Sequence, residues 1–182
     1  MPASKDDIAD VFWTHVEHYG FAKTSIEEVA RELGISKTTV YQYFSGKDDI
    51  LDYVIRNAAW REVGEIEQEY AALLSYGDRF EKLVRERVLQ ETRDWLDRYQ
   101  DTRARHQFEL GARVFGQVYD ILVQRWIAEG AEAGEFQLIA GDVLLTARCV
   151  GSILQYAIAQ TRADRALDID DAIVEAVRKL LA

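Results

Sequence analysis

The sequence predicts an all-α protein, and three observations support this prediction. The only proline among the 182 residues is Pro2, so no helix interior is interrupted by proline. Alanine, leucine, glutamate and arginine, which favour helices, are abundant along the chain. Apolar residues recur at intervals of three and four, as one face of a helix requires, and they make up 48% of the chain, which is enough for a packed core.

An amphipathic first helix is predicted over residues 6–19. Its apolar side chains recur at helical spacing and would form one buried face: Ile8, Val11, Phe12, Val16 and Tyr19. Gly20 follows directly after this pattern, so we expect the helix to end there.

A second, shorter helix is predicted over about residues 26–33. Ser25 and Glu28 have the spacing of a capping box, in which the hydroxyl accepts a hydrogen bond from a backbone N–H and the carboxylate reaches back. Gly34 supplies the left-handed residue at which such a helix ends.

A third helix, over about residues 37–43, follows after a tight turn that includes a glycine. Ser36 can cap it, and Val40 and Phe44 would anchor it to the core. Two short helices joined in this way, the second with small polar side chains at its start, describe a helix-turn-helix.

Longer helices are predicted over the rest of the chain. Ser45 would cap a helix that continues to about residue 75, with Asp48 and Asp49 at its positive N-terminal end. The remaining helices are predicted over residues 78–99, 104–130, 139–160 and 168–182.

Bulk properties limit the classes of protein to which this chain can belong. The net charge of −10 opposes a sequence-blind coat on nucleic acid, but screening over about 8 Å still permits a local DNA contact. No run of about 18 apolar residues and no signal peptide is apparent, so we expect a cytoplasmic protein without a membrane span. The single cysteine, Cys149, excludes an internal disulfide, and its apolar neighbours favour a buried, inert thiol over a redox role.

The helix over residues 37–43 has the composition of a DNA-reading helix. No acidic residue lies between Gly34 and Lys47. A helix fits the major groove, where its N-terminal residues meet base edges; these are Lys37, Thr38 and Thr39. Hydroxyl and ammonium groups nearby could meet phosphates, and they belong to Tyr41, Tyr43, Lys47, Thr24 and Ser25. A solvated polar face with tyrosines at the core edge would explain the same composition.

The order of residues in this stretch resembles the DNA-binding domain of the TetR (tetracycline repressor-like) family of transcriptional regulators. The family pattern has T-[ST]-x-x-x-[IV]-A, then G-[VI]-S-x-x-[TS]-[LV]-Y-x-[HY]-F, then K-[DE]-x-L. The chain matches these with TSIEEVARELGISKTTVYQYFSGKDDIL, in which Leu51 comes one position late. The match covers roughly residues 6–55, and the remainder is similar only in size and helical layout.

The resemblance implies an all-α homodimer that represses transcription from a palindromic operator and responds to a small-molecule effector. An N-terminal three-helix helix-turn-helix DNA-binding domain would occupy residues 1–46, and a C-terminal helical ligand-binding and dimerisation domain residues 47–182. By position, the groove would be faced by Lys37, Thr38, Thr39 and Tyr41. Phosphates would be held by Thr24, Ser25, Tyr43 and Lys47. Family members often have a basic N-terminal arm, whereas residues 1–50 here carry five Lys and Arg against nine Asp and Glu.

The larger domain is expected to dimerise and to bind the effector. In the resembled family the last two long helices meet those of a partner subunit, and the interface would involve Ala147, Gly151, Leu154, Ile158, Ile173 and Val177. The core of a monomer would explain the same pattern. Aromatic middle helices predict a pocket formed by Trp95, Phe108, Phe115, Tyr119 and Arg113. Ordinary core packing would also explain these aromatics, and Arg113 would then pair with Glu109.

Neither an enzyme nor a bound cofactor or metal is expected. The sequence contains no HExxH, CxxC, GxSxG or glycine-rich phosphate loop. His15 and His18 could supply two metal ligands, but no third is apparent, and His106 is isolated. The alternative to a regulator is a dimeric helical interaction module with a degenerate helix-turn-helix, which the acidic N-terminal half would suit.

Overall fold

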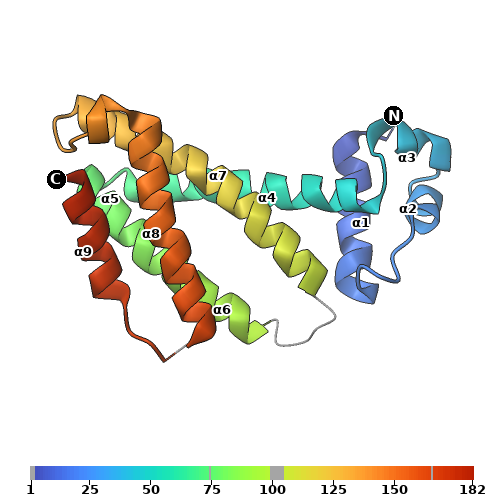
Figure 1. Cartoon of the computed structure of the whole chain (residues 1–182). Helices are drawn as coiled ribbons and strands as arrows, with labels where there is room; N and C mark the ends of the chain where they lie inside the picture. Colours follow the sequence, from blue (N-terminus) through green and yellow to red (C-terminus); the bar gives the residue numbers. More distant parts are fainter. Residues whose placement is uncertain (1–2, 74, 99–104, 165) are drawn as a thin grey trace. The chain divides into compact units, whose positions relative to one another are not determined.

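The computed structural model describes residues 3–73, 75–98, 105–164 and 166–182, and this part of the chain is helical and contains no strand (Figure 1). The helices are α1 (Lys5–Tyr19), α2 (Ile26–Glu32), α3 (Lys37–Tyr43), α4 (Lys47–Tyr70), α5 (Tyr76–Lys82), η1 (Leu83–Gln90), α6 (Glu91–Arg98), α7 (Arg105–Glu132), η3 (Ile139–Gly141), α8 (Val143–Ala163) and α9 (Asp170–Leu181). The predicted all-α fold is confirmed, and the three N-terminal helices begin within one residue of their predicted positions.

The chain divides into two compact units. The first unit comprises Met1–Glu62 and His106–Gly116, and the second comprises Val63–Arg105 and Gln117–Ala182. The division falls inside α4, whereas the boundary predicted after residue 46 coincides with the beginning of that helix. The first turns of α4 belong to the first unit because Ile50 and Leu51 are buried in its core.

The first unit has one apolar core, to which α1, α2, α3 and the start of α4 all contribute. Its buried residues are Ile8, Ala9, Phe12, Val16, Ile26, Val29, Ala30, Val40, Phe44, Ile50 and Leu51. They lie at the helical spacing that the sequence predicts, so one face of each helix is buried and the opposite face is left to solvent.

Side-chain caps fix where the N-terminal helices begin. Ser25 and Glu28 form the predicted capping box at the start of α2, and Ser36 accepts a hydrogen bond from the backbone N–H of Thr39 at the start of α3. Ser4 caps α1 in the same way as Ser25 caps α2. These bonds satisfy backbone donors that the helix itself leaves without partners.

The beginning of α4 differs from its prediction. The hydroxyl and the backbone N–H of Ser45 both donate to the carboxylate of Asp49, at 3.1 and 2.8 Å. The carbonyl of Gly46, not that of Ser45, accepts the first helical hydrogen bond, from Ile50. The prediction that Ser45 caps α4 is therefore wrong, because its hydroxyl serves as a donor to the side chain of Asp49.

An aromatic cluster lies at the centre of the second unit. The ring of Trp126 lies 6.1 Å from that of Tyr70 and 5.8 Å from that of Phe80, and Phe80 lies 5.7 Å from Phe136. Burial raises the pKa of Tyr70 to about 12. These aromatics come from α4, α5, α7 and the turn after α7, so they join segments that are distant in the sequence.

A π-helical segment, η1, interrupts the helix predicted over residues 78–99. Its buried side chains come in two adjacent pairs five residues apart: Leu83 with Val84, and Val88 with Leu89. A π-helix closes its hydrogen bonds over five residues rather than four, so this spacing keeps both pairs on the same face. The wide turn directs these pairs toward α8 and α9, which both pack against η1.

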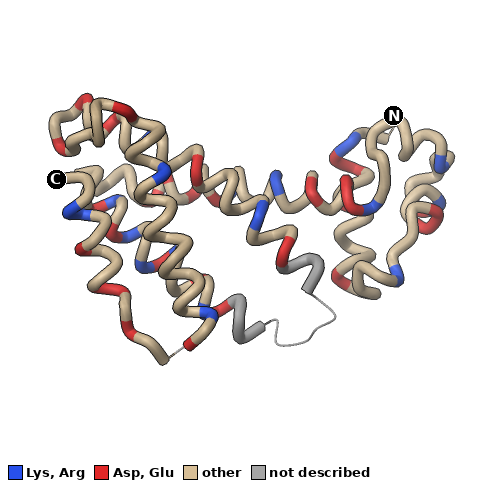
Figure 2. The backbone as a smooth tube through the Cα atoms, in the orientation of Figure 1, with Lys and Arg blue, Asp and Glu red and all other residues tan. Residues whose placement is uncertain are grey.

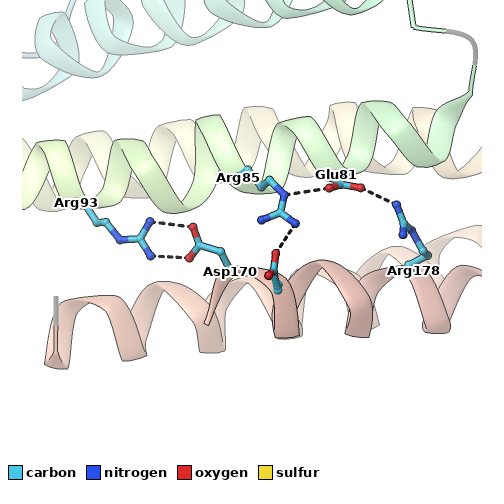
Figure 3. Close-up of polar contacts among 6 residues, drawn as sticks. Glu81, Arg85, Arg93, Asp170 and Arg178 are labelled. Carbon is cyan, nitrogen blue, oxygen red and sulfur yellow. Dashed lines mark hydrogen bonds and ion pairs between the residues drawn. The ribbon is translucent and has the colours of Figure 1, made fainter. Parts of the chain in front are cut away.

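Ion pairs connect α9 to α5, η1 and α6 (Figure 3). Arg93 and Asp170 form a two-pronged pair with N···O distances of 3.0 and 2.5 Å. Arg85 bonds to Asp171 at 2.6 Å, and Arg178 bonds to Glu81 at 2.6 Å. The bond to Asp170 raises the pKa of Arg93, which keeps the charged pair intact.

One helix of the second unit is more apolar than the sequence prediction allowed. By length and composition α8 meets the minimum for a membrane-crossing helix, with a mean hydropathy of 1.2 over the relevant window. Its inner face is buried in the unit, which is the usual position of an apolar core helix. Its outer face exposes Leu144, Leu145 and Tyr156.

Candidate nucleic-acid interface and ligand cavity

A tight turn joins α2 to α3. Gly34 adopts a left-handed conformation (φ 66°), and the backbone N–H of Ile35 returns to the carbonyl of Ala30 at 2.9 Å. Val40 and Phe44 are 0% and 2% exposed, so α3 is held to the core by these anchors, as predicted. The two helices and their turn form the predicted helix-turn-helix.

The outer face of α3 is polar and open to solvent. Lys37 and Thr38 are exposed at its beginning, and Tyr41 and Tyr43 are 52% and 41% exposed further along. Thr39 is partly buried, and its hydroxyl lies 2.9 Å from that of Ser36 in the helix cap. Thr38 therefore has the freer hydroxyl for reading a base.

Gln42 is a candidate base contact that the sequence interpretation omitted. It is exposed on α3, four residues after Thr38, so the two side chains lie on the same helical face. A glutamine amide can form paired hydrogen bonds with adenine in the major groove. The signal was its spacing from Thr38, which is visible in the sequence.

Lys37 is paired within the protein. Its ammonium group forms an ion pair with the carboxylate of Glu27, an exposed residue in the first turn of α2. The hydrogen bond to Lys37 lowers the pKa of Glu27, and the same bond raises the pKa of Lys37. Sequence reasoning assigned no role to Glu27, because it considered the acid-free stretch of α3 without the helix packed beside it.

Lys47 also has partners inside the protein. Its ammonium group donates to the carbonyls of Phe21 and Thr24, at 2.8 and 3.0 Å, and lies 4.6 Å from the centre of the Phe21 ring. These contacts close the loop between α1 and α2. Lys47 is thus placed as a structural cation, which does not fit its predicted role as a phosphate-binding residue.

The hydroxyl groups of Thr24 and Ser25 are engaged locally. Thr24 is 2% exposed, and its hydroxyl donates to the carbonyl of Gly20 at 3.1 Å. Ser25 uses its hydroxyl in the capping box, where it donates to the carboxylate of Glu28 at 2.8 Å. Phosphate contacts from these two hydroxyl groups do not fit this arrangement, because capping and loop closure already use them.

Few exposed cations remain near α3. Figure 2 shows acidic and basic residues interspersed along the backbone of the first unit. Among residues 3–55, Lys23 and Arg31 are exposed and have no ion-pair partner. Lys23 lies in the loop between α1 and α2, next to Thr24, so it replaces Thr24 as a candidate for contact with a phosphate.

The predicted dimer residues lie mostly inside the second unit. Ala147, Leu154, Ile173 and Val177 are between 2% and 8% exposed. Gly151 and Ile158 are half-buried. The burial of these four residues fits the alternative interpretation, a core within one chain. The apolar residues of α8 that face solvent are Leu144, Leu145 and Tyr156, at 44%, 41% and 60% exposed.

The predicted pocket residues are not assembled into one described site. Arg113 is exposed and pairs with Asp52 at 3.1 Å, rather than with Glu109. Phe115 and Tyr119 are half-buried and belong to different units. The side chains of Trp95 and Phe108 lie outside the described residues, so their part of the prediction stays open.

A cavity of about 300 Å³ lies in the second unit, among α5, η1, α9 and the turn after α7. Its apolar lining includes Phe80, Val84, Phe136, Val174, Val177 and Leu181. Charged side chains of Glu81, Glu135 and Arg178 also line it. The volume is at the lower end of the range for small-molecule sites, which are mostly apolar with a few polar groups.

The two histidines of α1 do not form a metal site with described neighbours. His15 pairs with Glu32 of α2, with 2.6 Å between Nε2 and the carboxylate oxygen. Within the part of the chain that the structure describes, no group of three or more His, Cys, Asp or Glu side chains is arranged to hold a metal ion.

Comparison with known proteins agrees with this geometry. Residues 16–54 match the family of bacterial regulatory proteins, tetR family. No curated protein gives a significant sequence match. These residues span α2, α3 and the start of α4, so the match contains the whole helix-turn-helix.

Solved structures of transcriptional regulators have a similar fold. FadR from Bacillus subtilis, in complex with stearoyl-CoA, is 14% identical with a TM-score of 0.58, covering 98% of this chain and 100% of FadR. RolR in complex with resorcinol is 19% identical with a TM-score of 0.65, covering 98% of this chain and 87% of RolR. PfmR, a TetR family regulator from Thermus thermophilus, is 18% identical with a TM-score of 0.50, covering 96% of each chain. Residues 16–54 therefore match the tetR family of bacterial regulatory proteins, and the chain as a whole is similar in fold to solved transcriptional regulators such as FadR and PfmR.

Proposed function

We propose that this chain is a TetR-family transcriptional regulator, a cytoplasmic repressor that binds a palindromic operator as a homodimer and is released by a small-molecule effector. The observation that carries the proposal is the outer face of α3, where Lys37, Thr38 and Gln42 face solvent while Val40 and Phe44 fix the helix to the core. Side chains placed in this way can reach base edges when the helix lies in the major groove.

Exposed apolar residues on the outer face of α8 support the proposal that the protein is a homodimer. Leu145 and Tyr156 are exposed, and Cys149 and Ile153 lie between them, half-buried, at spacings of three and four residues. An exposed apolar stripe on a helix favours contact with another apolar surface. A second copy of the same stripe, related by a two-fold axis, would bury it and would present two α3 helices to a symmetric operator.

The second unit supports effector binding, since it contains the 300 Å³ cavity with apolar walls. FadR and RolR were solved with stearoyl-CoA and resorcinol, which are ligands of those proteins. α4 contributes to both units and is our proposed lever between effector and operator. A switch from 1:99 to 99:1 between two dimer forms needs about 5.5 kcal/mol of differential effector binding.

Light scattering after size-exclusion chromatography tests the dimer. The wild-type protein should have twice the chain mass of 20.9 kDa. A variant with Leu145→Asp and Tyr156→Asp should be a folded monomer, because charge on the apolar stripe opposes its burial. Trp60→Asp, at an equally exposed apolar position on α4, is the control and should stay dimeric. A monomeric wild-type protein, or a dimeric double variant, would contradict the proposal.

Gel-shift titration against promoter DNA flanking the protein's own gene tests operator binding. We expect the wild-type protein to bind one such duplex and Tyr43→Phe to bind it more weakly, because Tyr43 is exposed at the end of α3. A dimer that ignores every candidate duplex at low salt would instead favour the helical interaction module.

A further inference from the structure

Glu27 places a carboxylate beside the DNA-reading end of α3. It lies in the first turn of α2, and its side chain is 58% exposed. Its Oε1 atom pairs with Nζ of Lys37, the first residue of α3, whose side chain is 48% exposed. The ion pair therefore joins the N-terminal ends of the two helices of the helix-turn-helix, on a surface open to solvent.

The ion pair changes what Lys37 offers to DNA. The hydrogen bond between the two groups lowers the pKa of Glu27 and raises that of Lys37, so both stay charged at neutral pH. A phosphate that approaches Lys37 also meets the negative charge of Glu27. Binding of a lysine to DNA phosphate is driven by release of condensed counterions, and a lysine that is already neutralised contributes to this release only after its ion pair opens.

The pairing of Lys37 matters because another lysine nearby is also bound within the protein. Lys47 is bound by the carbonyls of Phe21 and Thr24. Among residues 3–55, the exposed cations without an ion-pair partner are Lys23 and Arg31. Release of Lys37 from its ion pair would therefore be a large addition to the few cations available for sequence-independent binding of DNA.

We propose that Glu27 determines specificity by restraining Lys37. On DNA of arbitrary sequence the ion pair stays closed, and Lys37 adds little to phosphate binding. On the operator, base contacts from α3 compensate for opening the ion pair. Specificity is a difference between two affinities, so weakening the binding of unrelated DNA raises it as effectively as strengthening the binding of the operator.

Glu27→Gln is the variant that tests this inference. Its amide keeps the size of the side chain but cannot hold Lys37 as an ion pair. Binding of a random-sequence duplex should gain about one phosphate contact for each subunit that contacts the DNA, so the slope of log K against log salt should steepen by about 0.9 per contacting subunit. At about 0.1 M salt each such contact corresponds to roughly eightfold tighter binding. Lys37→Ala should have little effect in the wild-type background and should abolish the gain in the Glu27→Gln background.

Fluorescence anisotropy with a labelled random-sequence duplex, over a series of salt concentrations, gives both the affinity and the slope. Glu17→Gln is the matched control, since Glu17 is an exposed glutamate on α1 and the variant has the same change of charge. It should leave the slope unchanged. Equal thermal midpoints for all variants show that folding is intact.

Two results would overturn the inference while leaving DNA binding itself in place. One is an unchanged slope for Glu27→Gln. The other is an equal gain for Glu17→Gln, which would reveal a general effect of net charge. The inference rests on the proposed DNA-binding function, so it also fails if neither the wild-type protein nor Glu27→Gln binds any duplex at low salt. That result would show that the proposed DNA-binding function itself is wrong.

Discussion

The helix-turn-helix and the second unit differ in how their side chains are used. In the first unit short helices begin at serine caps, bury one apolar face and leave a polar outer face, which is the pattern of the sequence itself. In the second unit α8 buries residues along its length, a π-helical segment carries two pairs of buried apolar residues, and ion pairs join α9 to α5, η1 and α6. Local pattern thus specifies the first unit, whereas tertiary packing specifies the second.

The largest expected effect tests whether the two units are separate. Phe44 is 2% exposed and stacks edge-on against Tyr53 at 5.5 Å in the core of the first unit. Phe44→Ala should destabilise that unit by about 3–5 kcal/mol because it leaves a cavity, and it should abolish DNA binding. Hydrogen exchange should quicken in α1–α3 and stay slow in α8. Equally fast exchange in α8 would show that the chain unfolds as one body and that the two units are not independent.

The next prediction concerns the ion pairs of the second unit. Arg93 and Asp170 are each 21% exposed and form two hydrogen bonds, so Asp170→Asn should lower the free energy of unfolding by about 1–2 kcal/mol after allowance for solvent screening. Glu175→Gln, which breaks the exposed pair with Lys179, is the control and should change it by about 0.5 kcal/mol or less. Urea unfolding measures both. Equal effects would show that α9 is held by apolar contacts alone.

A helix cap in the first unit should contribute a similar amount to the free energy of unfolding. Ser25→Ala removes the cap of α2 and should destabilise the protein by about 1 kcal/mol. Ser152→Ala is the control, because the Ser152 hydroxyl donates to the Arg148 carbonyl on an exposed face of α8. Its effect should stay within about 0.5 kcal/mol. A cap that can be removed without effect would show that local pattern does not determine the first unit.

The cap also predicts how stability depends on pH. The hydrogen bond from Ser25 lowers the pKa of Glu28 below its ordinary value of 4.5. As pH falls, the Glu28 carboxylate is therefore protonated in the unfolded chain before it is protonated in the folded protein. The stability that this carboxylate contributes is complete above pH 4.5 and is lost as pH falls through the folded-state pKa. Urea unfolding from neutral to acid pH should show a smaller loss for Ser25→Ala than for the wild-type protein. Identical profiles would contradict the assignment.

The smallest expected effect separates two roles of Lys47. Because its ammonium group is bound to loop carbonyls, Lys47→Ala should weaken DNA binding through the loop and leave the salt slope within a few tenths of the wild-type value. A phosphate-binding lysine would lower the slope by about one. Anisotropy titrations at several salt concentrations measure the slope. A decrease of about one would restore the role predicted from the sequence.

The sequence predicted most of the first unit because the relevant signals are local. The spacing of Ser25 and Glu28, the position of Gly34 and the anchors Val40 and Phe44 act within a few residues of each other. Contacts between helices were missed. Glu27 lies on α2 and its partner Lys37 on α3, and nothing in either helix alone indicates that they meet.

The second unit was harder to predict because an apolar helix can turn either face inward. Leu154 and Val177 were assigned to the dimer interface, yet both are buried within the chain, and Leu145 and Tyr156 remain exposed. Small and apolar residues occur on both faces of α8, so their identity did not decide the matter. The π-helical turn had a signal in the paired apolar residues five apart, from Leu83 to Leu89, but such turns are rare and the ordinary helix was the better expectation.

Selection of bound sequences from a pool of random duplexes tests the central claim, that α3 reads bases in a symmetric pair of subunits. We predict enrichment of an inverted repeat whose half-site centres lie one helical turn, about 34–36 Å, or a multiple of it apart. Thr38→Ala and Gln42→Ala should each relax the preference at particular positions of the half-site. A pool without an enriched motif, or with a single asymmetric one, would contradict the account.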